Sequence, residues 1–295
     1  MSAARQRRWL GPAMVAPAVV YMAALVALPV LMALFYSVSD ARVGSDLIHF
    51  VGLRNFSGAL ATPAFRTALR NSLLFTLLSQ ILVIAGATCL ALALKEAFRG
   101  RGLVRLLILL PWVAPISLGA IGWKWLLDSL YSVVNWMLSY AHLVDPVHPP
   151  MWLGEPKLAM LSVVLVHTWR TLPFATVILL AGLTSIPRDI PEAAAVDGAG
   201  FWRTHFSITL PMIRPIVLVA FLFGVVFTFT DMTTVYILTR GGPADATQVL
   251  PSLAFFTGIL GGDLAGGAAI SLFLFPLLLV GAVLLLRIAR RAEVT

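Results

Sequence analysis

The chain has 295 residues, of which 60% are hydrophobic and 12% are charged, and its mean hydropathy is +0.94. Soluble domains are about 45–50% apolar and about 25% charged, so this composition excludes an ordinary soluble domain and predicts a chain solvated by lipid. The net charge of +8 does not predict nucleic-acid binding, because the basic residues flank apolar segments instead of forming one patch.

Six segments are apolar for about the 20 residues that a helix needs to cross a bilayer. The first has basic residues before it but is too long for a leader peptide, so we expect it to be a retained span. Several segments contain proline, which membrane helices tolerate because neighbouring helices satisfy the freed carbonyl groups. The sequence therefore predicts an all-α polytopic membrane protein with spans at 12–38, 71–94, 103–127, 158–182, 211–238 and 266–287.

Lysine and arginine are unevenly distributed between the two sides of these spans, and this asymmetry predicts their direction. Thirteen lie on the side of the termini and six on the other, so we expect both termini to be cytoplasmic in an inner membrane. The predicted parts are a cytoplasmic N-terminus at 1–11, a transmembrane domain at 12–288 and a cytoplasmic C-terminus at 289–295. The thirteen are Arg5, Arg7, Arg8, Lys95, Arg99, Arg101, Arg105, Arg188, Arg203, Arg214, Arg287, Arg290 and Arg291; the six are Arg42, Arg54, Arg66, Arg70, Lys157 and Arg240.

Two connections are expected to be ordered. The loop at 128–156 is rich in proline and would lie outside the cell. The apolar stretch 249–260 lies between glycine pairs and is too short to cross, so it could be a re-entrant or interfacial helix, or a loop that enters the mouth of a pathway.

The predicted cytoplasmic loop 185–210 has more structure than a linker needs. Pro191 and Glu192 suit a first helical turn, three alanines favour helix, and Gly198 stands where a left-handed residue would end it. A second short helix would then place Phe201, His205 and Ile208 on one apolar face. The pattern alone fits an amphipathic hairpin lying on lipid and a docking site for a soluble partner equally well.

Motifs in this loop resemble a known family. Glu192-Ala193-Ala194-Ala195-Val196-Asp197-Gly198-Ala199, followed by Ile208, Leu210 and Pro211, is similar to the EAA loop of binding-protein-dependent ABC importer permeases. Leu238 to Pro243 with Thr247 resembles the LTxGGPxxxT signature of the sugar branch, which Asn71-Ser72 and Leu109-Leu110-Pro111 also fit. The resemblance implies a six-helix sugar-permease fold.

The resemblance also implies partners and roles. It implies a second permease, a dimeric cytoplasmic ATPase that holds ATP and Mg²⁺, an extracytoplasmic binding protein, surrounding lipid and a sugar substrate, with no cofactor, metal or nucleic acid bound by this chain. The sugar could be trehalose, maltose, an oligosaccharide or glycerol phosphate. The ATPase-coupling residues it implies are Glu192, Ala193, Ala194, Asp197, Gly198, Ala199, Phe201 and Phe206.

The residues themselves favour a separate energy source. The three lysines, Lys95, Lys124 and Lys157, do not follow glycine, so the chain lacks a P-loop lysine. An ion-gradient-driven secondary transporter is the alternative, but Asp231 is the one carboxylate expected inside a span. A membrane enzyme is disfavoured, because the five histidines are scattered and the single Cys89 excludes a multi-cysteine metal site.

Polar residues within the predicted spans are candidates for the translocation pathway. His167 and Arg170 could line a pathway or pair with a carboxylate. The fifth span carries Thr230, Asp231, Thr234 and Tyr236, whose hydroxyl groups, carboxylate and ring suit a sugar. The alternative is that these groups form hydrogen bonds to a second permease.

Overall fold

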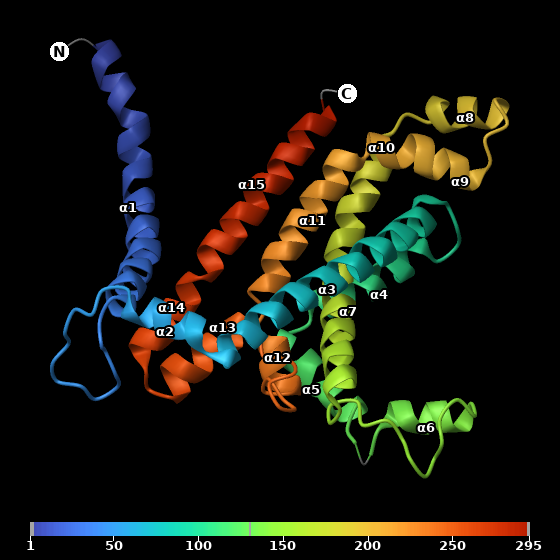
Figure 1. The fold of residues 1–295 in the computed structure, drawn as a ribbon. Helices are drawn as coiled ribbons and strands as arrows, with labels where there is room; N and C mark the ends of the chain where they lie inside the picture. Colours follow the sequence, from blue (N-terminus) through green and yellow to red (C-terminus); the bar gives the residue numbers. More distant parts are fainter. Residues whose placement is uncertain (1–2, 130, 294–295) are drawn as a thin grey trace. The chain divides into compact units, whose positions relative to one another are not determined.

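The computed structural model describes residues 3–129 and 131–293, and within them the side chains of residues 12–288 (Figure 1). These residues form helices without a strand, apart from an isolated bridge between Ser39 and Phe50. The predicted tails 1–11 and 289–295 lie outside the described side chains. The chain separates into two compact units, residues 1–62 with 254–273 and residues 63–253 with 274–295.

The first unit is built around a long apolar helix. Its large side chains are exposed, as expected for a surface that faces lipid. Backbone bonds from Val43 to Gly262 and from Ala265 to Ala41 hold the loop after this helix. The helices are α1 (Ala3–Ser37), α2 (Arg54–Ala61), η2 (Phe256–Leu260), which is a π-helix, and α14 (Leu264–Leu272).

The second unit is a bundle in which α3 and α7 pack along each other. Its core contains bulky residues such as Phe75 and Val163 at one end and small ones such as Ala87, Ala91 and Ala175 at the other. Small residues let membrane helices approach closely. Its helices are α3 (Pro63–Lys95), α4 (Arg101–Val113), α5 (Ile116–Leu126), α6 (Val133–Tyr140), α7 (Pro156–Ser185), α8 (Asp189–Val196), α9 (Phe201–Thr204), the π-helix η1 (His205–Thr209), α10 (Leu210–Met212), α11 (Arg214–Phe229), α12 (Thr233–Leu238) and α15 (Leu274–Glu293). The short α13 (Leu250–Phe255) crosses the boundary between the units.

The predicted spans are recovered, but two of them are bent. Four described helices are long and apolar enough to cross a membrane, or up to six if each bent pair is one span. The third predicted span bends by 96° between α4 and α5, where Pro115 cannot continue the helix. The fifth bends by 73° at residue 213 and is interrupted again between α11 and α12. Continuous helices over 103–127 and 211–238 are therefore corrected to broken ones.

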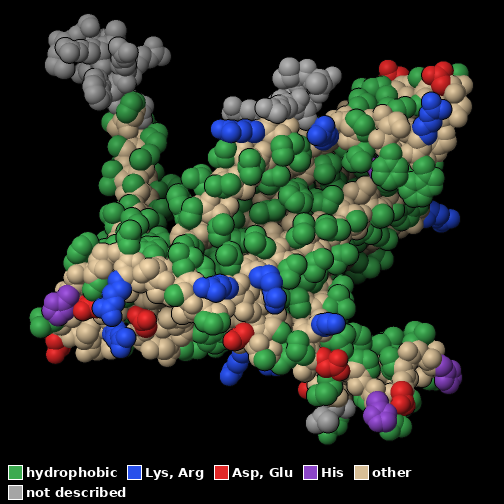
Figure 2. Space-filling view, in the orientation of Figure 1, with side chains coloured by type: hydrophobic (Ala, Val, Ile, Leu, Met, Phe, Trp, Pro, Cys, Tyr) green, Lys and Arg blue, Asp and Glu red, His purple; other side chains and the backbone are tan. Residues whose placement is uncertain are grey.

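The surface of the second unit is also apolar where lipid would cover it. On the face shown in Figure 2, hydrophobic side chains cover the middle of the helices, and charged side chains lie toward their ends and connections. Figure 1 shows α6 at one end of α7 and the hairpin of α8 and α9 at the other. The loop that carries α6 and the hairpin of α8 and α9 are thus separated by the length of α7.

Candidate functional site

The predicted hairpin forms, and its glycine has the predicted conformation. Gly198 has φ +79, and the amide groups of Gly198 and Ala199 donate to the carbonyl oxygens of Ala195 (3.1 Å) and Ala194 (2.9 Å). These two bonds close a Schellman motif, which needs a left-handed residue at this position. Asp189 and Glu192 lie in the first turn of α8, where the helix dipole favours negative charge.

The second half of the hairpin exposes apolar side chains. Trp202 is 69% exposed, and its ring stacks on that of Phe206 with centroids 5.9 Å apart. Phe201 stacks on His205, as the predicted spacing requires, yet His205 is buried while Phe201 is exposed. From His205 the chain continues as the π-helix η1, whose longer period shifts Ile208 from the position that regular i, i+7 spacing predicts.

Four of the predicted pathway residues meet where the fifth predicted span is interrupted. Oδ2 of Asp231 lies 2.7 Å from Nδ1 of His167 and 3.3 Å from Nη2 of Arg170, both on α7. Thr234 donates its backbone N–H to Oδ1 at 3.1 Å and its hydroxyl to Oδ2 at 2.6 Å. The side chain of Asp231 is 3% exposed and that of His167 is 0% exposed. Asp231 therefore links α7 to the first turn of α12 through buried contacts.

A second set of buried polar contacts extends this cluster to α3. Nε2 of His167 lies 2.8 Å from Oγ1 of Thr228, which also accepts a bond from Nε2 of Gln80 at 2.7 Å and donates to the carbonyl oxygen of Gly224 at 2.8 Å. A Cβ atom at Gly224 would overlap Oε1 of Gln80. A side chain at position 224 would therefore have to displace the Gln80 amide that contacts Thr228. Sequence reasoning missed Gln80, although a polar residue inside a span was the available signal.

The two remaining predicted pathway residues, Thr230 and Tyr236, have contacts outside this cluster, and Arg170 extends beyond it. Thr230 is exposed, and its hydroxyl donates to the carbonyl oxygen of Val226 in its own helix. Tyr236 is half-buried, with the guanidinium of Arg240 5.9 Å from its ring centroid. Arg170, whose side chain is 22% exposed, has Nε unpaired among the described residues. Since Nε is buried, any contact of Arg170 beyond that with Asp231 would involve the exposed part of its guanidinium.

The Gly-Gly-Pro signature forms a turn that is attached to α3 through Asn71, in the third turn of that helix. Thr247 donates its hydroxyl to the carbonyl oxygen of Gly242 at 2.8 Å and lies 2.6 Å from the hydroxyl of Thr239. Asn71 donates to the carbonyl oxygens of Asp245 (2.9 Å) and Gln248 (3.1 Å). The Asn71-Ser72 motif and the Gly-Gly-Pro signature lie far apart in the sequence but contact each other in the structure.

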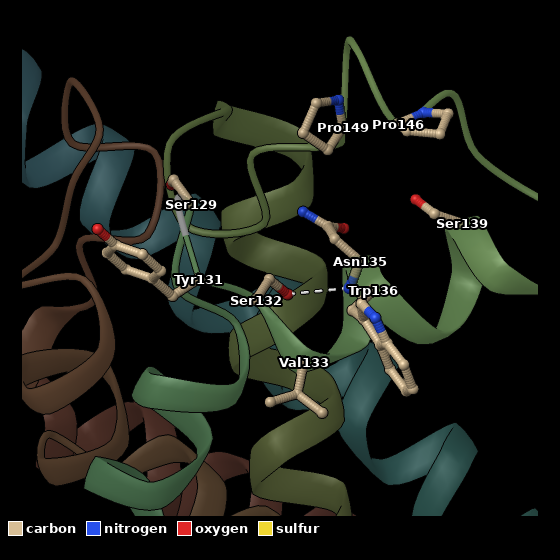
Figure 3. Close-up of a pocket in the computed structure, with 9 residues that line it drawn as sticks. All are labelled: Ser129, Tyr131, Ser132, Val133, Asn135, Trp136, Ser139, Pro146 and Pro149. Carbon is tan, nitrogen blue, oxygen red and sulfur yellow. Dashed lines mark hydrogen bonds between the residues drawn. The ribbon is translucent and has the colours of Figure 1, made fainter.

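The loop between α5 and α7 is folded and carries an open pocket of about 550 Å³ (Figure 3). Ser132 accepts the N–H of Asn135 at 3.1 Å, and the Asn135 side chain donates to the carbonyl oxygen of Pro150 and accepts from Trp152. Beyond the pocket, the N–H of Val147 and the side chain of His148 lower the pKa of Asp145, so the carboxylate stays ionised. The pocket lining includes Ser129, Tyr131, Ser132, Asn135, Trp136, Ser139, Pro146 and Pro149.

Comparison with known proteins decides the family. Residues 83–294 match the family described as the inner-membrane component of binding-protein-dependent transport systems. The chain belongs to this family. Its members are transport permeases, not enzymes, and the resemblance that the EAA loop carries is confirmed.

Several relatives match the permease over almost their whole length. It is 34% identical to the trehalose/maltose transport system permease protein MalF of Thermococcus litoralis, over 95% of this chain and 94% of that protein. It is 31% identical to the trehalose transport system permease protein SugA of Mycobacterium tuberculosis, over 93% and 87%. A solved bacterial ABC transporter for the import of the acidic polysaccharide alginate shares the fold, with a TM-score of 0.82 and 22% identity over 97% of this chain and 96% of that one.

Proposed function

We propose that this permease is one membrane subunit of an ATP-driven importer of a sugar, most simply a disaccharide of the trehalose or maltose kind. Several relatives at 30% identity or more carry the names of sugar-type transport permeases, including the sulfoquinovosyl glycerol permease SmoG of Agrobacterium fabrum. A second permease would complete the pathway, and a binding protein would deliver the sugar on the outer face. ATP and Mg²⁺ would be bound by a separate ATPase dimer.

The observation that carries this proposal is the hairpin of α8 and α9. It projects four exposed apolar side chains, Val196, Phe201, Trp202 and Phe206, next to the exposed Glu192. An apolar patch with a charged rim is typical of a protein interface. In the proposed complex this patch would seat in the ATPase, with Glu192, Ala193, Ala194, Asp197, Gly198 and Ala199 shaping the helix and its turn.

The substrate would pass near the buried cluster. Arg170, Asp231 and Thr234 lie at the interruption between α11 and α12, and membrane transporters place substrate groups at such broken helices. Since Asp231 and His167 satisfy each other, we propose that they hold the geometry, while the exposed part of the Arg170 side chain and the exposed Thr230 offer contacts to sugar hydroxyl groups.

The proposal is tested with the permease reconstituted in proteoliposomes with its partner permease, ATPase and binding protein. We expect uptake of radiolabelled trehalose or maltose that requires ATP and persists when a protonophore collapses the proton gradient. Uptake that stops with the gradient at constant ATP would support a secondary transporter instead. Glycerol phosphate and sulfated or uronic-acid glycosides, added as competitors, would define the sugar class.

A further inference from the structure

An apolar pocket that the proposed transport function does not use lies between α4 and α7. Its volume is about 350 Å³, and it lies at the end of α7 that leads into α8. The two hydroxyl groups in its wall, those of Thr176 and Thr184, donate to the carbonyl oxygens of Leu172 and Leu180 in their own helix. The wall is therefore effectively apolar. Its apolar members are Leu94, Ile108, Leu109, Val177, Leu180 and Ala181.

One edge of this pocket is strongly basic. Arg105 lines it, and Arg101 lies one helical turn earlier on α4. Nε of each arginine is buried and has no hydrogen-bond partner among the described residues. Lys95 and Arg99 belong to the same connection between α3 and α4, where Glu96 is the one acidic residue. Both arginine residues are partly exposed, so a group from outside the chain can reach the outer part of each guanidinium, and the excess of positive charge at this edge favours an anionic one.

We propose that this pocket binds an anionic phospholipid, with an acyl chain against the apolar wall and the phosphate on Arg101 and Arg105. An apolar groove that ends in a basic edge matches the two parts of such a lipid, and basic pockets between membrane helices bind anionic headgroups. A free phosphate would leave the apolar wall wet. A zwitterionic lipid such as phosphatidylcholine also presents a phosphate, but its own ammonium group balances that charge, so it would leave the excess positive charge of the two arginines uncompensated.

The occupant would lie beside the coupling hairpin. Thr184 lines the pocket, and α7 ends at Ser185, a few residues before α8 begins at Asp189. Lipid bound there contacts α4 and the last turn of α7, both of which must keep their places if the hairpin is to be presented in a fixed direction. Binding of anionic lipid is thus expected to affect the stability of this end of the bundle.

The experiment uses the purified full chain in a mild detergent. Native mass spectrometry measures the affinities of dioleoyl phosphatidylglycerol and dioleoyl phosphatidylcholine. A phosphatidylglycerol with a photoreactive acyl chain then maps the site. We expect preferential binding of phosphatidylglycerol and crosslinks in the peptides that carry Ile108, Leu109, Val177 and Leu180.

Matched variants separate the basic edge from the apolar wall. Each of Arg101→Gln and Arg105→Gln should weaken phosphatidylglycerol binding about fivefold, and the pair about thirtyfold, with a smaller loss for phosphatidylcholine because its ammonium group already balances its phosphate. Arg105→Lys keeps the charge and should retain most of the affinity, which guards against a folding defect in the glutamine variants. Arg99→Gln, an exposed arginine of the same connection that does not line the pocket, is the control. Ala181→Trp should fill the groove and abolish the acyl crosslinks.

Four results would overturn the proposal. Three of them are equal affinity for the two lipids, unchanged phosphatidylglycerol affinity in the double variant, and crosslinks confined to other helices. The fourth is an efficient disulfide between Val177→Cys and a cysteine introduced into the second permease, formed in an assembled complex that retains no lipid. The pocket would then be a protein interface.

Discussion

Replacement of Asp231 tests whether the buried cluster holds the bundle together. The carboxylate takes part in four hydrogen bonds, two with α7 and two with Thr234. Side-chain bonds in membrane proteins average about 0.6 kcal/mol each, which gives about 2.4 kcal/mol. Loss of one partner of a buried ion pair costs about 3–5 kcal/mol. Asp231→Leu, which keeps a similar volume, should therefore lower the free energy of unfolding by between about 2.5 and 5 kcal/mol.

Asp231→Asn should be milder but not neutral. Both carboxylate oxygens face donors, because Oδ1 accepts the Thr234 N–H and Oδ2 accepts its hydroxyl. The amide NH₂ must therefore face a donor in either orientation, although His167 could accept from it through Nδ1 in its other tautomer. We expect a loss nearer to about 2 kcal/mol.

Unfolding in mixed detergent micelles, followed by circular dichroism, measures these values. Thr230→Val is the matched control, since Thr230 is exposed and bonds to its own helix, and it should change stability by less than about 0.5 kcal/mol. The triple variant His167→Leu, Arg170→Met, Asp231→Leu should be at least about 2 kcal/mol more stable than Asp231→Leu, since no unpaired charge remains. A loss below about 1 kcal/mol in the single variant, or no recovery in the triple, would refute the reasoning.

Three further predictions concern the hairpin, the helix contact and the topology. Gly198→Val has open space for its side chain but a left-handed backbone, so it should cost about 1–2 kcal/mol locally and abolish coupled uptake without loss of membrane insertion, whereas Gly200→Ala should keep uptake. Gly224→Ala should displace Gln80 and lower the unfolding free energy by about 1–3 kcal/mol, while Gly122→Ala, with nothing within 4 Å, should be neutral; equal effects would count against the contact. With Cys89→Ser as background, an impermeant thiol reagent should label a cysteine at position 145 and not one at 199 in intact cells, and the reverse pattern would invert the predicted orientation.

The sequence predicts elements well where the reason is local. Span positions follow from apolar length, and the turn at Gly198 follows from a glycine after a helix of alanines, because neither needs information from elsewhere in the chain. The bends depend on tertiary packing. Pro111 lies inside α4 without ending it, while Pro115 marks the break before α5, and composition does not distinguish the two prolines.

The site was less predictable because its contacts are non-local. The polar character of His167, Arg170 and Asp231 marked them as functional candidates, but both of their expected roles, pathway or pairing, fitted the sequence. The structure pairs them across residues far apart in the chain. The attachment of Asn71 to the turn at Asp245 had no signal in either segment alone.

The continuity of α7 suggests how the hairpin and the buried cluster depend on each other. The helix runs unbroken from Pro156 to Ser185, so His167 lies about 27 Å from the end that leads into α8. Because α7 is a rigid helix, a displacement at the end that leads into the hairpin moves the rest of the helix as well. Along its length, α7 is also held by the contact between His167 and Asp231.

If α7 is this connection, the losses of uptake caused by Gly198→Ala and Asp231→Asn should be non-additive, because both variants disturb the same coupled movement. Independent sites at this separation give additive losses in the logarithm of the uptake rate. The measurement is ATP-driven uptake by the wild type, the two single variants and the double variant, each at equal complex concentration, with ATP hydrolysis recorded in parallel. Gly198→Ala is used because it is a weaker substitution than Gly198→Val and keeps residual uptake measurable. Additive losses would mean that the hairpin and the cluster act separately and that α7 does not connect them.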